Sequence, residues 1–352
     1  MTHWILAVNP GSTSTKLALF EDDSLYAAEA LRHNPRDLAP EIVDQLEYRT
    51  NLAEKWLNSV FVGDKLSAIV GRGGMLKPIP GGTYMVNEAM RQDLRKGVQG
   101  QHASNLGGLI AFELASKRGI PAFIVDPVSV DEMIPEARIS GMPEIQRHSS
   151  SHALNIRAIA RRAAKDLGQD LRDINLVLVH LGGGISVTPM AGGRMLDVND
   201  ANEMGPFSPE RSGGLPSGDL IDLCFSGKYT EDELRRKIVR SSGLSAYLGT
   251  NDGLEIERRI SAGDQKAQLI YKAMAYQIAK EIGAMATALS GQVRAIAITG
   301  GLAYSTMLTD WIKDDVRFIA PVLVYPGEDE LLALAQGCLR VIKGEEQSRE
   351  YV

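Results

Sequence analysis

A pattern of short strands joined by two turns occurs once in each half of this chain. The first copy spans residues 4–30, where two apolar runs flank the turn NPGSTST. The second spans residues 175–198, where the corresponding turn is LGGG. Internal similarity of this kind indicates a duplicated fold. Helical patterns, such as residues 37–60 and 151–168, alternate with further strands, which is typical of α/β proteins. We therefore predict two related α/β domains.

Composition narrows the class of protein. The 352 residues are enough for two domains, and the net charge of −6 without a basic block argues against nucleic-acid binding. The two cysteines, Cys224 and Cys338, are too few for a disulfide framework and fit a reducing cytoplasm. No apolar run reaches membrane-spanning length, and the early Asn-Pro-Gly argues against a signal peptide.

Three loops carry the donors that a phosphate group requires. A hairpin turn needs only Asn-Gly or a similar pair, whereas the first loop offers an amide, four hydroxyls and a lysine. Glycines allow the backbone to approach a phosphate, which N–H and O–H groups then bind. Ordinary turns use the same residue types, but three such loops, each directly after a strand, favour phosphate binding. The candidate residues are Asn9, Gly11, Ser12, Thr13, Ser14, Thr15 and Lys16, then His180, Gly182, Gly183 and Gly184, and finally Gly300 and Gly301.

The order of these loops resembles the acetate and butyrate kinase family, within the actin-like and sugar-kinase superfamily. The matching motifs are NPGSTSTK, HLGGGISV, ITGGLA and PFSPERSGGLPSGD (206–219). Residues 70–90, 102–108 and 326–337 have the form found in the butyrate kinase branch. The resemblance covers nearly the whole chain.

This resemblance implies a fold and a reaction. The fold would be α/β, with two duplicated actin-like (ribonuclease H-like) domains and a nucleotide cleft between them. Residues 1–147 with 328–352 would form the acyl-substrate and phosphate domain, including a returning C-terminal helix, and residues 148–327 the nucleotide-binding domain. The reaction would be reversible phosphoryl transfer from ATP to a short fatty acid, with ATP/ADP and Mg²⁺ as cofactors. Homo-oligomers are common in the family, and neither nucleic acid nor membrane is an expected partner.

Two arginines are candidates for neutralising the reacting anions. Carboxylate and γ-phosphate repel each other, and the planar, permanently charged guanidinium offsets that repulsion. Arg72 directly follows a buried strand and matches a family arginine, although a surface salt bridge is the alternative. The second family arginine precedes a Ser-Gly-Asp sequence, where this chain has Pro216. Arg211, a few residues earlier, is the candidate replacement.

Asp126 is the candidate metal residue and matches a catalytic aspartate of the family. It ends the buried strand PAFIVD, and Mg²⁺ prefers carboxylate oxygens. Capping of a following helix is the alternative role. A second metal-associated acid of acetate kinases corresponds to Tyr304 here, so the metal site is expected either to have fewer protein ligands or to be completed by a residue elsewhere.

Three histidines are candidate catalytic residues. His102 matches a family histidine that hydrogen-bonds the phosphoryl group, although a polar residue at a helix N-terminus is the alternative. His180 ends the strand before the second loop. His148 and His152 form an H-x₃-H pair that would share one helix face, although Ser151 is also a plausible helix N-cap. The resemblance links His148 to the phosphoryl site, and zinc is not favoured.

Gly74 and Pro209 are the candidate substrate residues. Acetate kinases carry a bulkier apolar residue where this chain has Gly74, so the glycine is expected to leave room for a longer acyl chain. One methylene is worth only about 1–3 kcal/mol of discrimination, so selectivity should be partial. We predict a kinase of butyrate or a branched analogue that acts by direct in-line transfer. The alternatives are an acetate or propionate kinase, a sugar kinase on the same fold, and an actin-like nucleotide switch.

Overall fold

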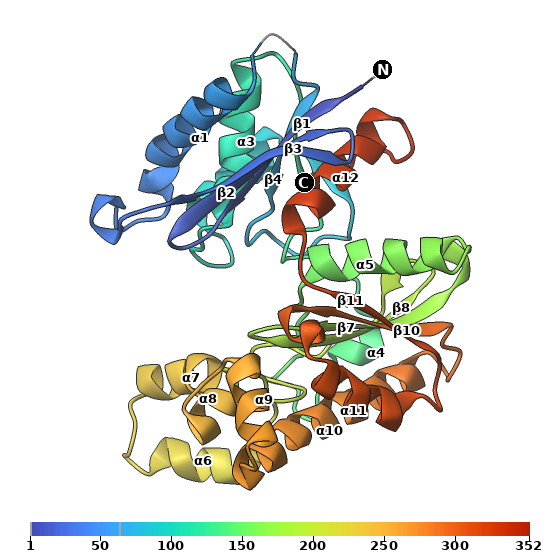
Figure 1. Ribbon diagram of the computed structural model, residues 1–352. Coiled ribbons are helices and arrows are strands. Elements are labelled where there is room, and N and C mark those ends of the chain that lie inside the picture. Colours follow the sequence, from blue (N-terminus) through green and yellow to red (C-terminus); the bar gives the residue numbers. More distant parts are fainter. Residues whose placement is uncertain (1, 63–64) are drawn as a thin grey trace. The chain divides into compact units, whose positions relative to one another are not determined.

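The structure is a computed structural model that describes residues 2–62 and 65–352. The chain forms two compact units, Met1–Asp131 with Asp329–Val352, and Glu132–Glu328 (Figure 1). The division therefore falls earlier than the predicted boundary at residue 147. Residues 132–147 belong to the second unit because Met133 and Ala137 pack with Val198, and because Arg147 pairs with Asp197 at 2.9 Å.

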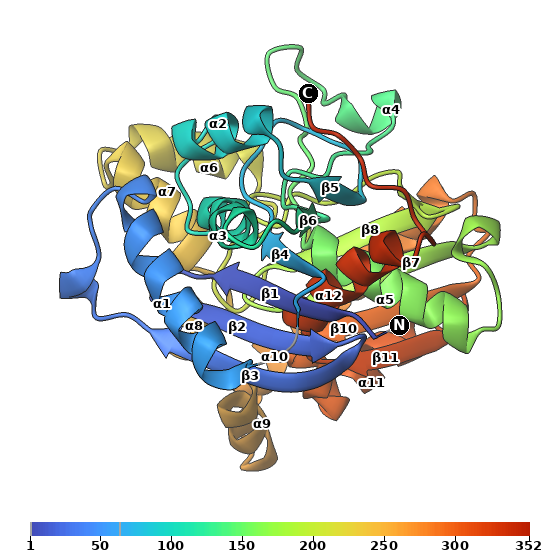
Figure 2. The same cartoon turned by 90° about the horizontal axis from the view of Figure 1, so that it is seen from above.

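The first unit is built on a six-stranded sheet in the order β3-β2-β1-β4-β6-β5. Its central strand β1 pairs antiparallel with β2 and parallel with β4, which pairs parallel with β6. Helices α1 and α3 cover one face of the sheet and α12 covers the other (Figure 2). The strands are β1 (Trp4–Pro10), β2 (Ser14–Glu21), β3 (Ser24–Arg32), β4 (Ala68–Arg72), β5 (Thr83–Met85) and β6 (Ala122–Val125). The helices are α1 (Leu46–Val60), α2 (Glu88–Lys96), α3 (Asn105–Ser116) and α12 (Glu330–Ile342).

The second unit repeats this arrangement around a five-stranded sheet in the order β11-β10-β7-β8-β9. Its central strand β7 pairs antiparallel with β8 and parallel with β10, as β1 does with β2 and β4. Helix α5 lies on one face, and α10 and α11 lie on the other (Figure 1). The strands are β7 (Asn175–Leu181), β8 (Ile185–Ala191), β9 (Arg194–Met195), β10 (Ala295–Gly300) and β11 (Val322–Pro326). The helices are α4 (Pro135–Arg138), α5 (Ala153–Asp166), α6 (Ser217–Phe225), α7 (Glu231–Arg240), α8 (Gly243–Leu248), α9 (Gly253–Ser261), α10 (Gln265–Ala288) and α11 (Thr306–Val316).

Helices on both faces explain why the central strands are apolar throughout. Side chains of a strand alternate between faces, and Leu6 and Val8 of β1 enter the core formed with α1 and α3. Ile5 and Ala7 point the other way and are also fully buried. Strands covered on both sides lack the polar alternation of a half-exposed sheet. None of the helices within the described residues has the length and hydropathy that a membrane crossing requires.

Strand register brings three predicted residues to one edge of the first sheet. Val8 is opposite Gly71, and Gly71 is opposite Ile124. Asn9, Arg72 and Asp126 therefore lie where three adjacent parallel strands end. Ligands of open α/β sheets bind at this edge, so the fold places polar groups where a site is expected.

The close contact of α3 with β4 leads to a prediction. A Cβ on Gly107 would lie 2.2 Å from the carbonyl oxygen of Arg72, whereas a Cβ on Gly283 in α10 would meet no atom within 4 Å. We expect Gly107→Ala to destabilise the fold by roughly 3 kcal/mol because backbone must shift. Gly283→Ala should stabilise by up to about 1 kcal/mol through helix propensity. Thermal unfolding of both variants checks the opposite signs, and an unaltered Gly107→Ala protein would contradict the packing.

Candidate functional site

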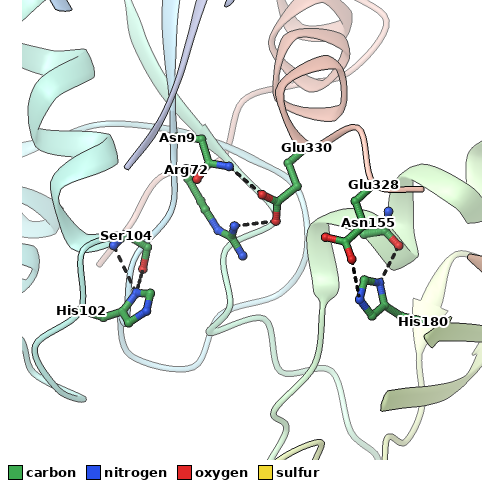
Figure 3. A network of polar contacts seen from close by, with 8 residues as sticks. All are labelled: Asn9, Arg72, His102, Ser104, Asn155, His180, Glu328 and Glu330. Atoms are coloured by element: carbon green, nitrogen blue, oxygen red, sulfur yellow. Dashed lines mark hydrogen bonds and ion pairs between the residues drawn. The ribbon is translucent and has the colours of Figure 1, made fainter. Parts of the chain in front are cut away.

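In the first unit, Arg72 and Asn9 converge on the carboxylate of Glu330. The Arg72 guanidinium Nη1 lies 2.5 Å from Glu330 Oε1, and Asn9 Nδ2 donates to Glu330 Oε2 at 2.6 Å (Figure 3). The Arg72 and Glu330 side chains are 25% and 20% exposed, so solvent still reaches the pair. A surface salt bridge was the alternative role of Arg72. Arg72 does form an ion pair, but its partner Glu330 lies 258 positions away in the sequence and also binds Asn9. Arg72 and Asn9 thus direct their N–H donors at the two oxygens of one carboxylate.

Asp126 ends β6 in a conformation that few residues adopt. Its φ is +39° and its side chain is buried. Asp126 Oδ1 accepts from the Gly82 N–H at 2.7 Å, and the Asp126 N–H donates to the Gly82 carbonyl at 3.0 Å. Strained backbone of this kind clusters at functional sites. The alternative of a helix cap is wrong, since the next helix, α4, begins at Pro135 with Ile134 as its N-cap.

His102 is held by Ser104 through its Nδ1 atom. Its Nδ1 accepts from the backbone N–H of Ser104 at 3.2 Å and lies 2.8 Å from the Ser104 hydroxyl (Figure 3). The residue is exposed overall, yet desolvation of the ring by the surrounding protein and then the charge of Arg72 lower its pKa from 6.5. Both effects favour the neutral imidazole. With Nδ1 accepting from Ser104, the Nε2–H of that form is a donor suited to a phosphoryl oxygen.

In the first loop, the structure separates inward-facing from outward-facing hydroxyls. Ser12 and Thr13 are exposed, as is Lys16. Thr15 is fully buried, and its hydroxyl contacts His33 at 2.8 Å. Thr15 therefore belongs to the support of the loop, which corrects its inclusion among the phosphate donors.

In the second unit, His180 is held on three sides. Its Nδ1 lies 2.9 Å from Asn155 Oδ1 and its Nε2 lies 3.2 Å from Glu328 Oε1 (Figure 3). His152 stacks on it with ring centroids 3.7 Å apart, and His152 Nδ1 lies 2.9 Å from the Ser186 hydroxyl. His180 is only 1% exposed, so its contact with phosphate stays a prediction.

His148 and His152 do not share a helix face. Helix α5 begins at Ala153 with His152 as its N-cap, so the expected cap at Ser151 is also wrong. His148 lies before the helix and is exposed, whereas His152 packs on His180. Among the described residues, no group of three His, Cys, Asp or Glu side chains has the arrangement of a metal centre.

Arg211 lies against the second glycine loop. A Cβ on Gly184 would fall 2.2 Å from Arg211 Nη1, which donates to the Ala201 carbonyl at 2.8 Å. The Ser208 hydroxyl donates to the Gly183 carbonyl and accepts from the Arg211 N–H, so this segment folds onto the loop. Burial lowers the pKa of Arg211. Gly184 is thus required for the guanidinium to lie beside the loop backbone.

The two predicted substrate residues are closely packed. A Cβ on Gly74 would lie 2.6 Å from the Cα of Asn105, so the glycine does not leave the open space that we expected; helix α3 fills it. Pro209 is buried, and its carbonyl accepts from the Ser245 N–H at 2.9 Å.

In the third loop, Gly300 has φ +96°, and a Cβ there would lie 2.3 Å from the Leu181 carbonyl oxygen. It exchanges backbone hydrogen bonds with Gly327 at 3.2 and 3.0 Å. Gly301 begins the short 3-10 helix Gly301–Tyr304. A glycine at 300 is therefore needed to bring the ends of β7 and β10 together.

Comparison with known proteins assigns the chain to a family. A model of the acetokinase family matches residues 142–313. "Probable butyrate kinase 2" of Caldanaerobacter subterraneus subsp. tengcongensis is 52% identical over 351 residues, covering 99% of each chain. The chain belongs to the acetokinase family. "Butyrate kinase 2" of Clostridium acetobutylicum matches this chain with the same identity and coverage. The crystal structure of Porphyromonas gingivalis acetate kinase superposes with a TM-score of 0.80, at 20% identity, over 97% of this chain and 100% of that one. The family and the duplicated α/β fold predicted from the sequence are confirmed.

Several residues of the candidate site were not predicted from the sequence. Glu330 has a local signal only for a helix start, because Asp329 caps α12 by accepting from the Leu332 N–H. Its partners lie in strands far away in sequence, which no local pattern indicates. The same holds for Asn155 and Glu328, which contact His180. At the position of the missing family acid, the Tyr304 side chain is 70% exposed.

Proposed function

We propose that this protein transfers phosphate from ATP to butyrate or a branched short-chain acid, giving an acyl phosphate and ADP. ATP-dependent phosphorylation of a short-chain fatty acid is the reaction class of its family, and both full-length relatives are named butyrate kinases. The structural observation that supports the proposal most is the convergence of Arg72 and Asn9 on a carboxylate.

The proposed reaction is a direct displacement. A carboxylate oxygen of the acid attacks the γ-phosphorus in line, and the bond to the bridging oxygen of ADP breaks. The acid is already deprotonated at neutral pH, so no general base is required. Arg72 offsets the charge on the transferring group, and Asn9 and His102 orient it through N–H donors. In this proposal the substrate anion takes the place of the Glu330 carboxylate and replaces its contacts with Arg72 and Asn9.

The second unit supplies the remaining groups in this proposal. The backbone of Gly182–Gly184 and the Arg211 guanidinium beside it suit the nucleotide phosphates. The Gly300–Gly301 turn, which follows a buried strand, suits the adenosine. His180 remains a candidate because it ends the strand before the second loop, and His148 because of the family resemblance.

Magnesium is the proposed cofactor, and Asp126 is its proposed ligand. Mg²⁺ is usually bound by one or two carboxylates together with substrate phosphates and waters. A single buried carboxylate, fixed at the end of β6 by Gly82, fits that chemistry. When bound, Mg²⁺ would offset the negative charge of the nucleotide's phosphates.

A panel of acids tests the proposal. Straight and branched acids of two to six carbons are supplied with ATP and Mg²⁺, and the acyl phosphate is trapped with hydroxylamine. We expect kcat/KM to be highest for four-carbon or branched acids. Each methylene should change the free energy of transition-state binding by about 1–3 kcal/mol. A maximum of kcat/KM at acetate or propionate would show that this acid, and not butyrate, is the preferred substrate. No hydroxamate with any acid would overturn the proposed reaction.

A further inference from the structure

Arg49 of helix α1 is a fully buried arginine, with 0% of its surface exposed. A charged side chain at such a depth is costly unless it is paired or fully hydrogen-bonded. Burial lowers the pKa of Arg49, but a guanidinium stays protonated in proteins. The residue therefore places a permanent positive charge inside the first unit.

The guanidinium is satisfied by neutral acceptors. Gln45 Oε1 accepts from Nε at 3.1 Å and from Nη2 at 2.8 Å, and the Thr15 hydroxyl accepts from Nη1 at 3.1 Å. The other acceptors are backbone carbonyls of the first loop. Across residues 2–62 and 65–352, no carboxylate lies within ion-pair distance of Arg49. The charge is thus hydrogen-bonded but not neutralised.

The hydrogen bonds from Arg49 to backbone carbonyls orient the first loop. Nη1 donates to the carbonyls of Gly11 at 2.9 Å and Ser14 at 3.2 Å, and Nη2 donates to that of Ser12 at 3.2 Å. The Thr13 carbonyl accepts from the His33 N–H at 2.9 Å. Four consecutive carbonyls are therefore used inside the protein. This removes from the loop surface the carbonyl oxygens that would repel a phosphate.

The groups around the loop do not cancel this charge. His33 contacts the Thr15 hydroxyl, and burial and then the charge of Arg49 lower its pKa from 6.5, which favours the neutral form. The exposed groups of the loop are the Ser12 and Thr13 hydroxyls and the Lys16 ammonium. The surface of the loop thus carries donors, with an unneutralised cation beneath it.

We propose that Arg49 is a positioning residue for nucleotide binding: it holds residues 11–15 with their carbonyls turned inward and supplies the positive charge that makes this loop a phosphate site. This inference rests on the proposed function only in taking ATP or ADP as the ligand. It assigns a role to a residue that contacts no substrate and that sequence motifs do not indicate.

The test uses Arg49→Gln, which keeps polar contacts but removes the charge, and Arg49→Lys, which keeps the charge but not the fork. Arg118→Gln is the matched control, because Arg118 lies in the same unit and binds Glu54 and a helix carbonyl. ADP affinity is measured by calorimetry without any acid, and KM for ATP and for butyrate is measured separately. Binding without turnover keeps this test independent of the acid that is phosphorylated.

We expect Arg49→Gln to weaken ADP binding and raise KM for ATP at least about tenfold, by analogy with lost charge-assisted contacts. KM for butyrate should change less than about twofold, Arg49→Lys should lose less than Arg49→Gln, and Arg118→Gln should match the wild type. A folded Arg49→Gln protein with wild-type ADP affinity, or equal losses for nucleotide and acid, would overturn the proposal.

A measurement on the unaltered protein covers the case in which both Arg49 variants fail to fold. Hydrogen exchange of the amides in residues 11–14 is compared with and without ADP. Slower exchange in the presence of ADP supports the proposal. Exchange that ADP leaves unchanged would overturn it, because the loop would then bind no nucleotide.

Discussion

Replacing Arg72 with alanine should lower turnover by about 10³-fold or more, by analogy with arginines that stabilise phosphoryl-transfer transition states. The loss has two physical causes. The charge that offsets the repulsion between acid and γ-phosphate disappears, and Glu330 loses its 2.5 Å partner at the same edge of the sheet. Initial rates of hydroxamate formation measure the effect. Arg72→Lys should recover only part of it, because an ammonium lacks the planar fork.

Arg172→Ala is the control for this experiment. Arg172 pairs with Asp170 at the surface, and its side chain is 84% exposed, so its loss should leave turnover within about twofold of the wild type. Thermal unfolding establishes that both variants are folded. A fall of less than tenfold in a folded Arg72→Ala protein would remove Arg72 from the chemistry.

Asp126→Asn should lower turnover by about 10²–10³-fold, the range observed when one preorganised charge-stabilising group is removed. Asparagine tolerates positive φ and can accept the Gly82 N–H, so the fold should be kept while the charge is lost. Asp126→Ala removes the acceptor as well and should also destabilise the protein. The comparison separates the charge of Asp126 from its structural role.

The dependence of the rate on Mg²⁺ concentration decides whether that charge serves the metal. If Asp126 is a ligand, the asparagine variant needs more Mg²⁺ for half-maximal activity. Wild-type turnover and an unshifted Mg²⁺ dependence in Asp126→Asn would remove Asp126 from both roles.

Much of the fold could be predicted because strand and turn patterns are local. The duplicated strand pattern gave the two sheets, and Asn9, Arg72 and Asp126 lie at strand ends as expected. The helix expected over residues 37–60 begins only at Leu46, after two short 3-10 turns. Pro35 and Pro40 disfavour helical backbone in the residues that precede them. The apolar spacing of residues 37–60 alone did not indicate this later helix start.

The parts of the site that could not be predicted depend on contacts between distant segments. Glu330 reaches Arg72 across 258 positions, and Arg49 reaches the first loop from the following helix. At Gly74 the sequence suggested space that packing removes. A glycine leaves open space only if no other segment occupies the place of the missing side chain. Here Asn105 does. Sequence patterns identify residue types at loop and strand ends, but tertiary packing decides which of them meet.

Phosphorus NMR of the wild-type protein with ATP, Mg²⁺ and butyrate tests the central claim most directly. Phosphoryl transfer to the acid predicts an acyl phosphate resonance that grows one-for-one with ADP and that declines when excess ADP is added. Release of inorganic phosphate with ADP from the outset, without any acyl phosphate, would contradict the claim, as would phosphate that appears only on a sugar hydroxyl when a sugar replaces the acid.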